Sequence, residues 1–411
     1  MDGGNLDILL DYEGIQRDIS PEKIFAGEEH SLWRYLPLLP VTDPGSLGTP
    51  LRAAGGTPVF APGRLADKLG LRYLWIKDES RNPTASFKDR ASAVVVARAR
   101  EIGADVIVTA STGNAGAALA GMAAAVGQKS VIFAPKTAPP AKIAQLMIYG
   151  SRVVLVDGTY DDAFDLTILA AQEFGWYCRN TGYNPFTAEG KKTAAFEIWE
   201  WAWRESRESR VENSKSSNRT SESSHYSPLP NLDSRLSVFV SVGDGNIISG
   251  LHKGFKDLLA LGWIEQLPRI YGVQAEGSAA IANAFHARTE TITPVSASTL
   301  ADSISVDLPR DGVRAVRAAR ETGGTYIVVS DEDILAAIAA LGSVGIFAEP
   351  AGATSYAGLV KAVSMGVVGP GEPVIVVNTG SGLKDVKAAM QAAGDAPVIE
   401  PTLEAVRRVI K

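Results

Sequence analysis

The sequence has very little of the residues from which several kinds of site are built. Its 411 residues include one cysteine, Cys178, and four histidines, none of which form a pair with the spacing of metal ligands on a helix. A single thiol excludes an internal disulfide framework and a thiolate zinc site, and we expect no histidine-based metal site. We interpret Cys178, within 176–179, as a small core residue of a short buried strand.

Long apolar runs and clusters of positive charge are also missing. No stretch reaches the about 18 uncharged apolar residues that a membrane span requires. The first residues have neither a basic segment nor an apolar run, so we expect no signal peptide and a cytoplasmic location. The formal net charge is −6 and no Lys/Arg-rich segment occurs, so neither nucleic acid nor an anionic membrane is an expected partner.

What the sequence does contain is a long alternation of strands and helices. From about residue 70, apolar β-branched runs alternate with alanine-rich segments, a pattern typical of parallel sheets that are covered by helices on both faces. Strands are predicted over 71–77, 105–110, 130–134, 152–156, 236–241, 269–274, 325–329 and 373–378. Helices are predicted over 86–102, 115–126, 140–149, 160–174, 190–204, 247–261, 278–286, 313–321, 331–341, 354–365 and 384–392.

The segment 205–235 interrupts this alternation. It is rich in serine, asparagine and arginine and has almost no apolar residues. Such a segment cannot bury enough surface to offset the entropy cost of ordering it. We therefore predict a flexible insertion at the surface.

The most informative motif is 77–90, where a strand ends, a polar Asn-Pro loop follows and a helix begins. Ser86 is a suitable N-cap for this helix. Lys88 then lies in the first turn, where the helix dipole disfavours a cation. An amine in a positive field has a lowered pKa and is a better nucleophile for an aldehyde. The motif indicates a reactive lysine, with an ordinary exposed lysine as the alternative.

A second loop, 111–116, follows the strand predicted over 105–110 and leads into an alanine-rich helix. A small polar loop at the carboxyl end of a strand and the start of a helix is suited to bind an anion. Ser111, Thr112 and Asn114 add side-chain donors to the free amides, and a substrate carboxylate is the expected ligand. The alternative is a capped turn without a ligand.

Two more loops follow buried strands. In 241–250, two glycines flank Asp244 at the start of a helix, so that successive amides can converge on a phosphate while the carboxylate points away. The loop matches neither a Walker sequence nor G-x-G-x-x-G. In 378–385, a hydroxyl could meet a ring nitrogen, and this neutral partner would leave a pyridine unprotonated.

Together, the four segments resemble fold-type II pyridoxal-phosphate enzymes, and their residues are most similar to those of the threonine synthases. The lysine motif is Asn-Pro-Thr-Ala-Ser-Phe-Lys-Asp-Arg at 82–90, and the resemblance spans about residues 30–400. The other matching segments are 31–35, 56–58, 111–114, 243–246, 272–277, 329–332, 349–351 and 379–385.

The resemblance implies pyridoxal 5′-phosphate as the cofactor. Lys88 would be the Schiff-base lysine, Phe87 would flank the ring, Asn114 would bond the 3′-oxygen and Thr379 would meet the pyridine nitrogen. The family's substrate-carboxylate loop corresponds to Ser111, Thr112 and Asn114. The cofactor phosphate would be held by the amides of Gly243, Asp244, Gly245, Asn246 and Ile247.

The resemblance also implies a two-lobed α/β fold like that of the tryptophan synthase beta chain, with parallel or mixed sheets flanked by helices. Residues 1–84 and 191–411 would form the large cofactor-binding domain, and 85–190 a small inserted domain. The implied reaction converts O-phospho-L-homoserine and water to L-threonine and phosphate. A homodimer that takes a small amino-acid substrate is the expectation for the family.

Two departures from the family pattern keep other functions open. The family commonly has an arginine that binds the substrate phosphate where this chain has Thr187, although Lys191 or Lys192 could supply a positive charge instead. The glycine loop is one residue shorter than the common form. The alternatives are a threonine/serine dehydratase or another β-elimination or β-replacement enzyme, and a non-catalytic α/β ligand-binding protein.

Overall fold

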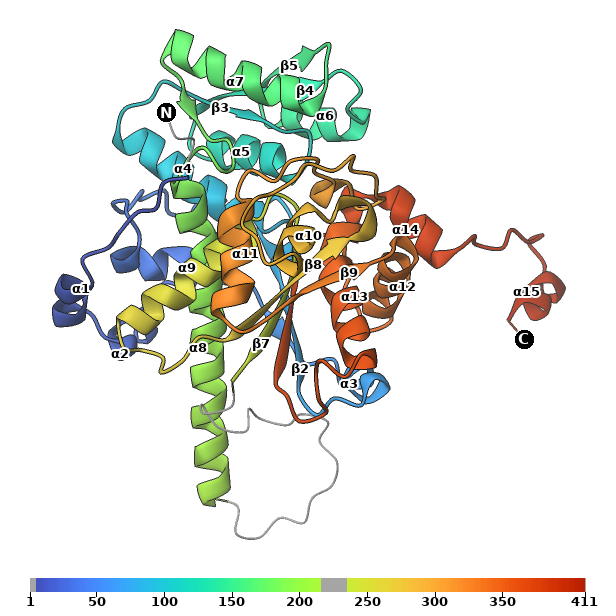
Figure 1. Cartoon of the computed structure of the whole chain (residues 1–411). Helices are drawn as coiled ribbons and strands as arrows, with labels where there is room; N and C mark the ends of the chain where they lie inside the picture. Colours follow the sequence, from blue (N-terminus) through green and yellow to red (C-terminus); the bar gives the residue numbers. More distant parts are fainter. Residues whose placement is uncertain (1–4, 216–234, 411) are drawn as a thin grey trace.

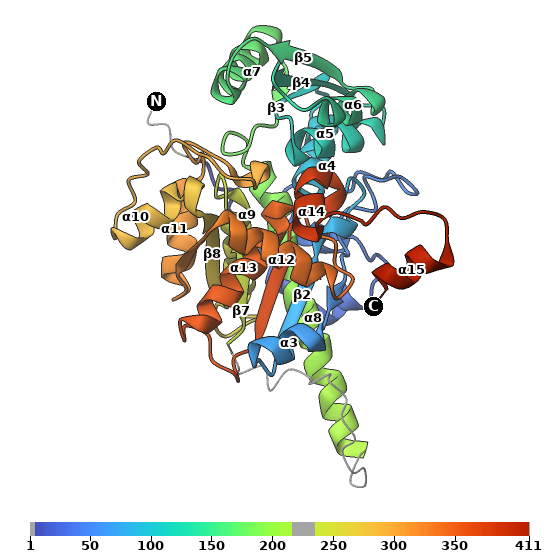
Figure 2. The ribbon, with the colours of Figure 1, turned by 90° about the vertical axis from the view of Figure 1, so that its right-hand side faces the viewer.

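The structure, a computed structural model, describes residues 5–215 and 235–410. It contains two β-sheets, each packed between helices, with the smaller sheet lying above the larger one in Figure 1. Figure 2 shows the same arrangement turned by 90°, and Figure 1 shows helix α15 (Leu403–Val409) away from the main body. No helix in the described ranges is long and apolar enough to cross a membrane.

The large sheet has six strands in the order β1-β2-β10-β7-β8-β9. All neighbouring pairs are parallel except β1 and β2, which are antiparallel, so the sheet is mixed. The strands are β1 (Val59–Phe60), β2 (Leu74–Asp78), β7 (Ser237–Ser241), β8 (Arg269–Ala275), β9 (Tyr326–Val329) and β10 (Val374–Asn378). Only β1 was not predicted from the sequence, because two residues show no alternation.

Both faces of the large sheet are buried, and successive residues alternate between them. Trp75 packs into one core cluster with residues of α8, α9, α10 and α11, whereas its neighbours Leu74 and Ile76 pack into a second cluster with α3, α12 and α13. Alternation with a period of two, with helices over both faces, explains why the strand sequences are apolar throughout. The predicted α/β class with parallel and mixed sheets is confirmed.

The small sheet has four parallel strands in the order β5-β4-β3-β6. Helix α7 covers one face, where Val108 and Phe133 pack against Phe164. Helices α4, α5 and α6 cover the other face, which buries Ile107 and Ile132. The strands are β3 (Val106–Ala110), β4 (Lys129–Pro135), β5 (Arg152–Val156) and β6 (Tyr177–Cys178). The short strand expected around Cys178 is thus present, while the exact lobe boundaries stay a prediction.

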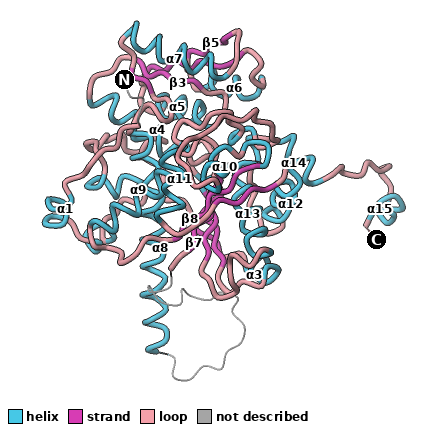
Figure 3. The backbone as a smooth tube through the Cα atoms, viewed as in Figure 1, coloured by secondary structure: helices cyan, strands magenta, loops and turns pink. Residues whose placement is uncertain are grey.

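Helices α4 to α14 follow the predicted order, whereas α1, α2, α3 and α15 were not predicted. Figure 3 shows the helices in cyan along the backbone. Helices α4, α5 and α9 begin directly at sequence motifs and are described with the site. The helices are α1 (Tyr12–Asp18), α2 (Pro21–Phe25), α3 (Gly63–Leu69), α4 (Lys88–Glu101), α5 (Asn114–Ala124), α6 (Pro140–Ile148), α7 (Tyr160–Phe174), α8 (Phe186–Lys215), α9 (Asn246–Ala260), α10 (Ala280–His286), α11 (Gly312–Glu321), α12 (Asp331–Gly342), α13 (Pro350–Ser364) and α14 (Val386–Ala393).

One helix corrects a prediction. Helix α8 does not end near residue 204 but continues to Lys215, so the first part of the segment expected to be flexible is helical. No glycine or proline interrupts 205–215, and adding residues to an existing helix costs little because no new nucleus is needed. The rest of the predicted flexible insertion, 216–234, lies outside the described residues.

A buried group of four charges connects β2, α4 and α8. Arg90 donates to Glu79 at 2.6 Å and to both carboxylate oxygens of Glu197 at 2.7 Å, and Lys77 donates to Glu197 at 2.7 Å. These side chains have almost no solvent exposure. The two positive charges lower the pKa of the Glu197 carboxyl well below its usual range, despite its burial. Two cations and two anions therefore balance inside the protein.

We expect Glu197→Gln to destabilise the protein strongly. The substitution leaves Lys77 and Arg90 with a single buried anion, Glu79, and removing one partner from a buried ion group costs about 3–5 kcal/mol. The free energy of unfolding from urea titration measures the loss. Glu290→Gln is the control, because its partners Arg317 and Arg320 lie at the surface and less than about 1 kcal/mol should be lost. Equal losses in the two variants would contradict the interpretation.

Candidate active site

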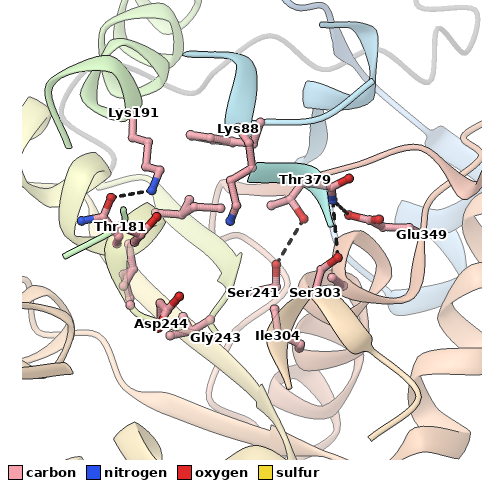
Figure 4. A pocket seen from close by; sticks show the side chains of 18 residues that line it. Lys88, Thr181, Lys191, Ser241, Gly243, Asp244, Ser303, Ile304, Glu349 and Thr379 are labelled. Atoms are coloured by element: carbon pink, nitrogen blue, oxygen red, sulfur yellow. Dashed lines mark hydrogen bonds between the residues drawn. The ribbon is translucent and has the colours of Figure 1, made fainter. Parts of the chain in front are cut away.

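The carboxyl ends of three neighbouring strands, β2, β10 and β7, bring their following loops to one edge of the large sheet. In parallel sheets this edge is where ligands usually bind. A cavity lies there and reaches α5 and α8 on its far side (Figure 4). Its lining includes most residues singled out from the sequence: Phe87, Lys88, Asn114, Thr181, Lys191, Ser241, Val242, Gly243, Asp244, Gly245, Asn246, Ile247, Ile248, Ser303, Ile304, Glu349, Ala351 and Thr379.

The loop before Lys88 is fixed to the segment that follows β10. The carbonyl of Ala85 accepts from the Ser381 amide at 3.1 Å, and the Phe87 amide donates to the Thr379 carbonyl at 2.9 Å. These bonds hold Ala85 at φ 65°, a left-handed conformation that side chains other than glycine rarely adopt. The lysine loop and the Thr379 segment therefore have one fixed relative position.

The predicted cap of this helix is wrong. Helix α4 begins at Lys88, its N-cap residue is Phe87, and no side chain caps it. Ser86 instead forms a bridge with Gly380 through its backbone. Its hydroxyl is buried and has no hydrogen-bond partner among the described residues. The backbone pairing, which the local sequence does not reveal, takes precedence over the cap.

Lys88 lies in the first turn of α4, as predicted, and is its first residue. Its amine enters the cavity (Figure 4). Burial lowers the pKa of this amine, and the nearby positive charge of Arg179 lowers it further, while Asp244 and Glu349 act in the opposite direction. No carboxylate within the described ranges forms an ion pair with it. A larger fraction of the amine is therefore neutral, the form that attacks a carbonyl and accepts a proton.

The glycine loop forms a concave surface at the start of α9. A Cβ atom at Gly243 would lie 2.8 Å from Ile304 Cα, and one at Gly245 would lie 2.8 Å from the Asp311 carbonyl oxygen. Gly245 also has φ 90°. Within the described part of the chain, the amides of residues 243–247 donate to no protein acceptor. Free amides at a helix N-terminus bind a phosphate, so the loop fits the phosphate of pyridoxal 5′-phosphate.

The side chain of Asp244 lies beside this loop. One carboxylate oxygen accepts from the Arg310 amide at 3.3 Å, so the side chain is anchored on the neighbouring chain segment and not on the amides of its own loop. Burial raises the pKa of this carboxyl, whereas that bond and the charges of Lys88 and Lys191 lower it. Asp244 is the acidic residue that faces the two lysines of the cavity.

Asn114 connects the small sheet to the large one. Its side-chain amide donates to Glu349 at 2.7 Å and lies 3.5 Å from the Ser303 hydroxyl (Figure 4). Burial raises the pKa of the Glu349 carboxyl to about 7, although the bond from Asn114 opposes this shift. Glu349 can therefore bind or release a proton near neutral pH. On the opposite wall, the hydroxyls of Thr379 and Ser241 lie 3.5 Å apart.

The predicted carboxylate loop is only partly directed into open space. Thr112, Gly113 and Asn114 line a second recess next to the cavity, together with Lys142 and Lys384. Ser111 lines neither recess, and its hydroxyl accepts from the Gly113 amide at 3.2 Å within its own loop. The structure thus brings Thr112 and Asn114 to the site, whereas Ser111 supports the loop.

The two lysines considered as replacements for the arginine absent at 187 have different surroundings. Thr187 is buried and bonds Asn184 and Asn246. Lys191 lines the cavity and also bonds the Asn246 side chain. Lys192 points elsewhere and pairs with Glu189 at 2.6 Å and Asp257 at 2.7 Å.

Several residues of the cavity were not identified as site residues from the sequence, namely Thr181, Ser241, Ser303 and Glu349. Glu349 precedes Pro350 at the start of α13, so a structural role at the helix start would have explained it. The only thiol, Cys178, lies outside the cavity lining, and burial raises its pKa to about 11. No cluster of three or more metal-ligating side chains occurs among the described residues.

Comparison with known proteins agrees with this geometry. Residues 51–380 match the family model described as pyridoxal-phosphate dependent enzyme. The threonine synthase of Methanocaldococcus jannaschii is 37% identical over 413 residues, which cover 100% of this chain and 94% of the relative. The threonine synthase of Methanosarcina acetivorans is 35% identical, covering 99% of this chain and 92% of the relative.

Among solved structures, threonine deaminase isoform 2 from Solanum lycopersicum superposes with a TM-score of 0.66 over 95% of each chain, at 21% identity. This likeness shows a shared fold and confirms the fold-type II prediction. The predicted cofactor and the prediction of an enzyme are confirmed by the family match. The chain belongs to the pyridoxal-phosphate dependent enzyme family and, within it, to the threonine synthases.

Proposed function

We propose that the protein converts O-phospho-L-homoserine and water to L-threonine and phosphate with pyridoxal 5′-phosphate bound in the cavity. The observation that carries the proposal is the amine of Lys88, which has no ion-pair partner in the described ranges and shares a cavity with a loop of free amides. The relatives named threonine synthase, similar over nearly the whole chain, support the substrate.

The residues around the cavity fit the cofactor. The amides of residues 243–247 would hold its phosphate, Lys88 would bond its aldehyde carbon, and the buried ring of Phe87 would flank its ring. Thr379 would donate to the ring nitrogen and Asn114 to the 3′-oxygen. When bound, the cofactor supplies an electron-withdrawing ring that stabilises negative charge at the substrate Cα.

Lys88 moves the protons of the reaction. Once the substrate's own amine has replaced Lys88 on the cofactor, the lowered pKa of Lys88 increases the neutral fraction of its amine. The amine can then take a proton from the substrate Cα and next from Cβ, and it can return protons to Cγ and Cα. The phosphate leaves from Cγ with its bridging oxygen, and the oxygen of water adds at Cβ. The fixed loop from Ala85 to Phe87 keeps the amine at one position.

The small-sheet loop orients the substrate. Thr112 and the amides at the start of α5 bind the carboxylate, which places Cα toward Lys88. Ser111, predicted as a third ligand, contributes by holding the loop through its bond to the Gly113 amide. Glu349 holds the Asn114 side chain on the opposite side. The loop of the small sheet thus binds the substrate carboxylate, while Lys88 at the edge of the large sheet faces its Cα.

Three further expectations accompany this function. We propose that the cavity separates a large domain of residues 1–84 and 191–411 from a small one of residues 85–190. A homodimer is the proposed assembly and the cytoplasm the proposed location. Both rest on the family resemblance and on the composition of the sequence, and neither is needed for the chemistry described above.

Substrate assays separate the proposal from the dehydratase that Thr187 suggested. Purified holoenzyme should release phosphate and L-threonine from O-phospho-L-homoserine in equal amounts. L-Threonine and L-serine should give 2-oxobutanoate or pyruvate at least about a hundredfold more slowly, because neither carries a phosphate to leave from Cγ. Fast formation of ammonia and 2-oxo acid, with O-phospho-L-homoserine inert, would establish the dehydratase instead.

We expect Lys88→Ala to reduce turnover at least about 10³-fold, because the variant has no amine that can move the Cα proton. Borohydride reduction of wild-type holoenzyme should attach the cofactor to the peptide that contains Lys88, as mass spectrometry of a digest can show. Lys361→Ala is the control, since its amine bonds the Val328 carbonyl at the surface. Labelling of any other lysine would reject the assignment.

Glu349→Gln should change how stability depends on pH. In the folded cofactor-free protein the carboxyl has a pKa raised to about 7, compared with 4.5 for an ordinary glutamate, so the folded state binds the proton more tightly. The contribution of this carboxyl to the free energy of unfolding is complete below pH about 4.5 and is lost as the pH rises to about 7. Relative to the variant, the wild type should lose about 3 kcal/mol across this window. Urea denaturation at pH 4.5 and pH 7.5 measures the free energy of unfolding of both proteins. The same difference between wild type and variant at the two pH values would contradict the raised pKa.

A further inference from the structure

The fully buried cations of the described chain fall into two groups. Lys77, Arg90 and Lys192 each contact at least one carboxylate at 2.6–2.7 Å. Lys191 and Arg179 are equally buried, with no exposed surface, yet neither forms an ion pair with a carboxylate of the described residues. A buried charge without a partner is costly, so an unpaired one indicates a ligand that supplies the missing anion.

Lys191 belongs to the cavity because of its place on α8. It lies four residues, about one helical turn, after Thr187, so the two side chains are on the same face of the helix. Both donate to the side-chain oxygen of Asn246, the residue that starts α9 at the glycine loop. Figure 4 shows the Lys191 amine directed into the cavity, beside that of Lys88.

Arg179 follows β6 and extends the small sheet, since its amide donates to the Val108 carbonyl at 2.8 Å. One guanidinium nitrogen, Nη1, donates at 3.1 Å to the hydroxyl of Thr181, which lines the cavity. The Nε atom lies 3.4 Å from the Ser92 hydroxyl. The remaining nitrogen, Nη2, is buried and has no partner among the described residues. A guanidinium held by two hydroxyls thus keeps one donor without a partner, directly behind the cavity wall that Thr181 forms, although Arg179 itself does not line the cavity.

Charges of both signs surround the cavity. Burial and the nearby charges of Lys88 and Arg179 lower the pKa of Lys191 well below its usual range, whereas Asp311 and Asp244 act in the opposite direction. Within the described residues, neither carboxylate forms an ion pair with Lys191 or Arg179, because Asp311 contacts Asn246 and Arg314 and Asp244 accepts from the Arg310 amide. The cofactor phosphate is already matched by the free amides of residues 243–247. The two unpaired cations therefore suit a second anion.

We propose that Lys191 and Arg179 bind the phosphate group of the substrate and take over the role of the arginine that this chain lacks at Thr187. The assignment rests on the proposed function for the identity of the anion. Lys191 reaches the same Asn246 oxygen as Thr187 from one turn further along α8, and Arg179 restores a guanidinium from the adjoining strand of the small sheet. The substrate phosphate then lies between the two domains, in contact with each.

Three lysine and arginine variants test the pair in the holoenzyme. Arg179→Met and Lys191→Met should each raise the KM for O-phospho-L-homoserine at least about tenfold, because each removes a charged hydrogen-bond donor to the phosphate. Cofactor content, read from the visible absorbance, should stay as in the wild type. Lys192→Met is the matched control, since this neighbour on α8 is paired with Glu189 and Asp257 and should lose stability without a selective change in KM.

Thermal unfolding separates ligand binding from a structural role. Removing an unpaired buried cation should leave the melting temperature of the cofactor-free protein unchanged or higher in Arg179→Met and Lys191→Met. Lowered melting temperatures in both variants, with KM unchanged, would overturn the proposal. Loss of cofactor with an unchanged KM would also overturn it, and would assign the two cations to the cofactor phosphate.

Inorganic phosphate gives a test that does not require turnover. Phosphate should stabilise wild-type holoenzyme against heat and compete with the substrate, and at least about tenfold more phosphate should be needed for the same effect in either variant. If the wild type binds phosphate in this way but leaves O-phospho-L-homoserine unchanged, the proposed function fails and the anion site stands. If the variants respond to phosphate as the wild type does, the anion site fails.

Discussion

Burial of Arg90 between two glutamates is the constraint on which the position of the reactive lysine depends. The guanidinium joins Glu79, the residue directly after β2, to Glu197 on α8, and Lys77 completes the balance of charge. Because Arg90 lies two residues after Lys88, the same contacts fix the first turn of α4. Helix α4 has no capping side chain, and the ion pairs of Arg90 fix its first turn instead.

The neighbouring residues Lys191 and Lys192 show how one helix separates structural charge from functional charge. Lys192 faces two carboxylates and belongs to the framework, whereas Lys191 faces the cavity and forms no ion pair within the described residues. A fold can tolerate such an unpaired buried cation only where a ligand or a neutral form relieves it. The same reasoning applies to Lys88, whose neutral amine is the chemically useful form.

The sequence alone predicted most of the fold, because apolar periodicity is a local property. Strand β5 and helix α7 have the predicted bounds, and the loops after β2, β3, β7 and β10 carry the expected polar residues. What it could not supply were contacts between distant segments. The bond of Asn114 to Glu349 joins residues 235 positions apart, and the backbone pairing of Ser86 with Gly380 displaced the expected cap. The orientation of Arg179 likewise depends on partners from other elements.

The place of Lys88 at the very start of α4 has a mechanical consequence. Helix α4 extends about 21 Å from the edge of the large sheet to the core under the small sheet, where Val94 and Val96 pack with Ile107. A tilt of the small sheet that carries α4 with it would pivot near the anchored end of the helix. The far end, at Glu101, would then travel furthest, while the amine would keep its position relative to Thr379. In such a tilt, the amine of Lys88 would lie near the axis, and the loop proposed to bind the substrate carboxylate would lie on the part that moves.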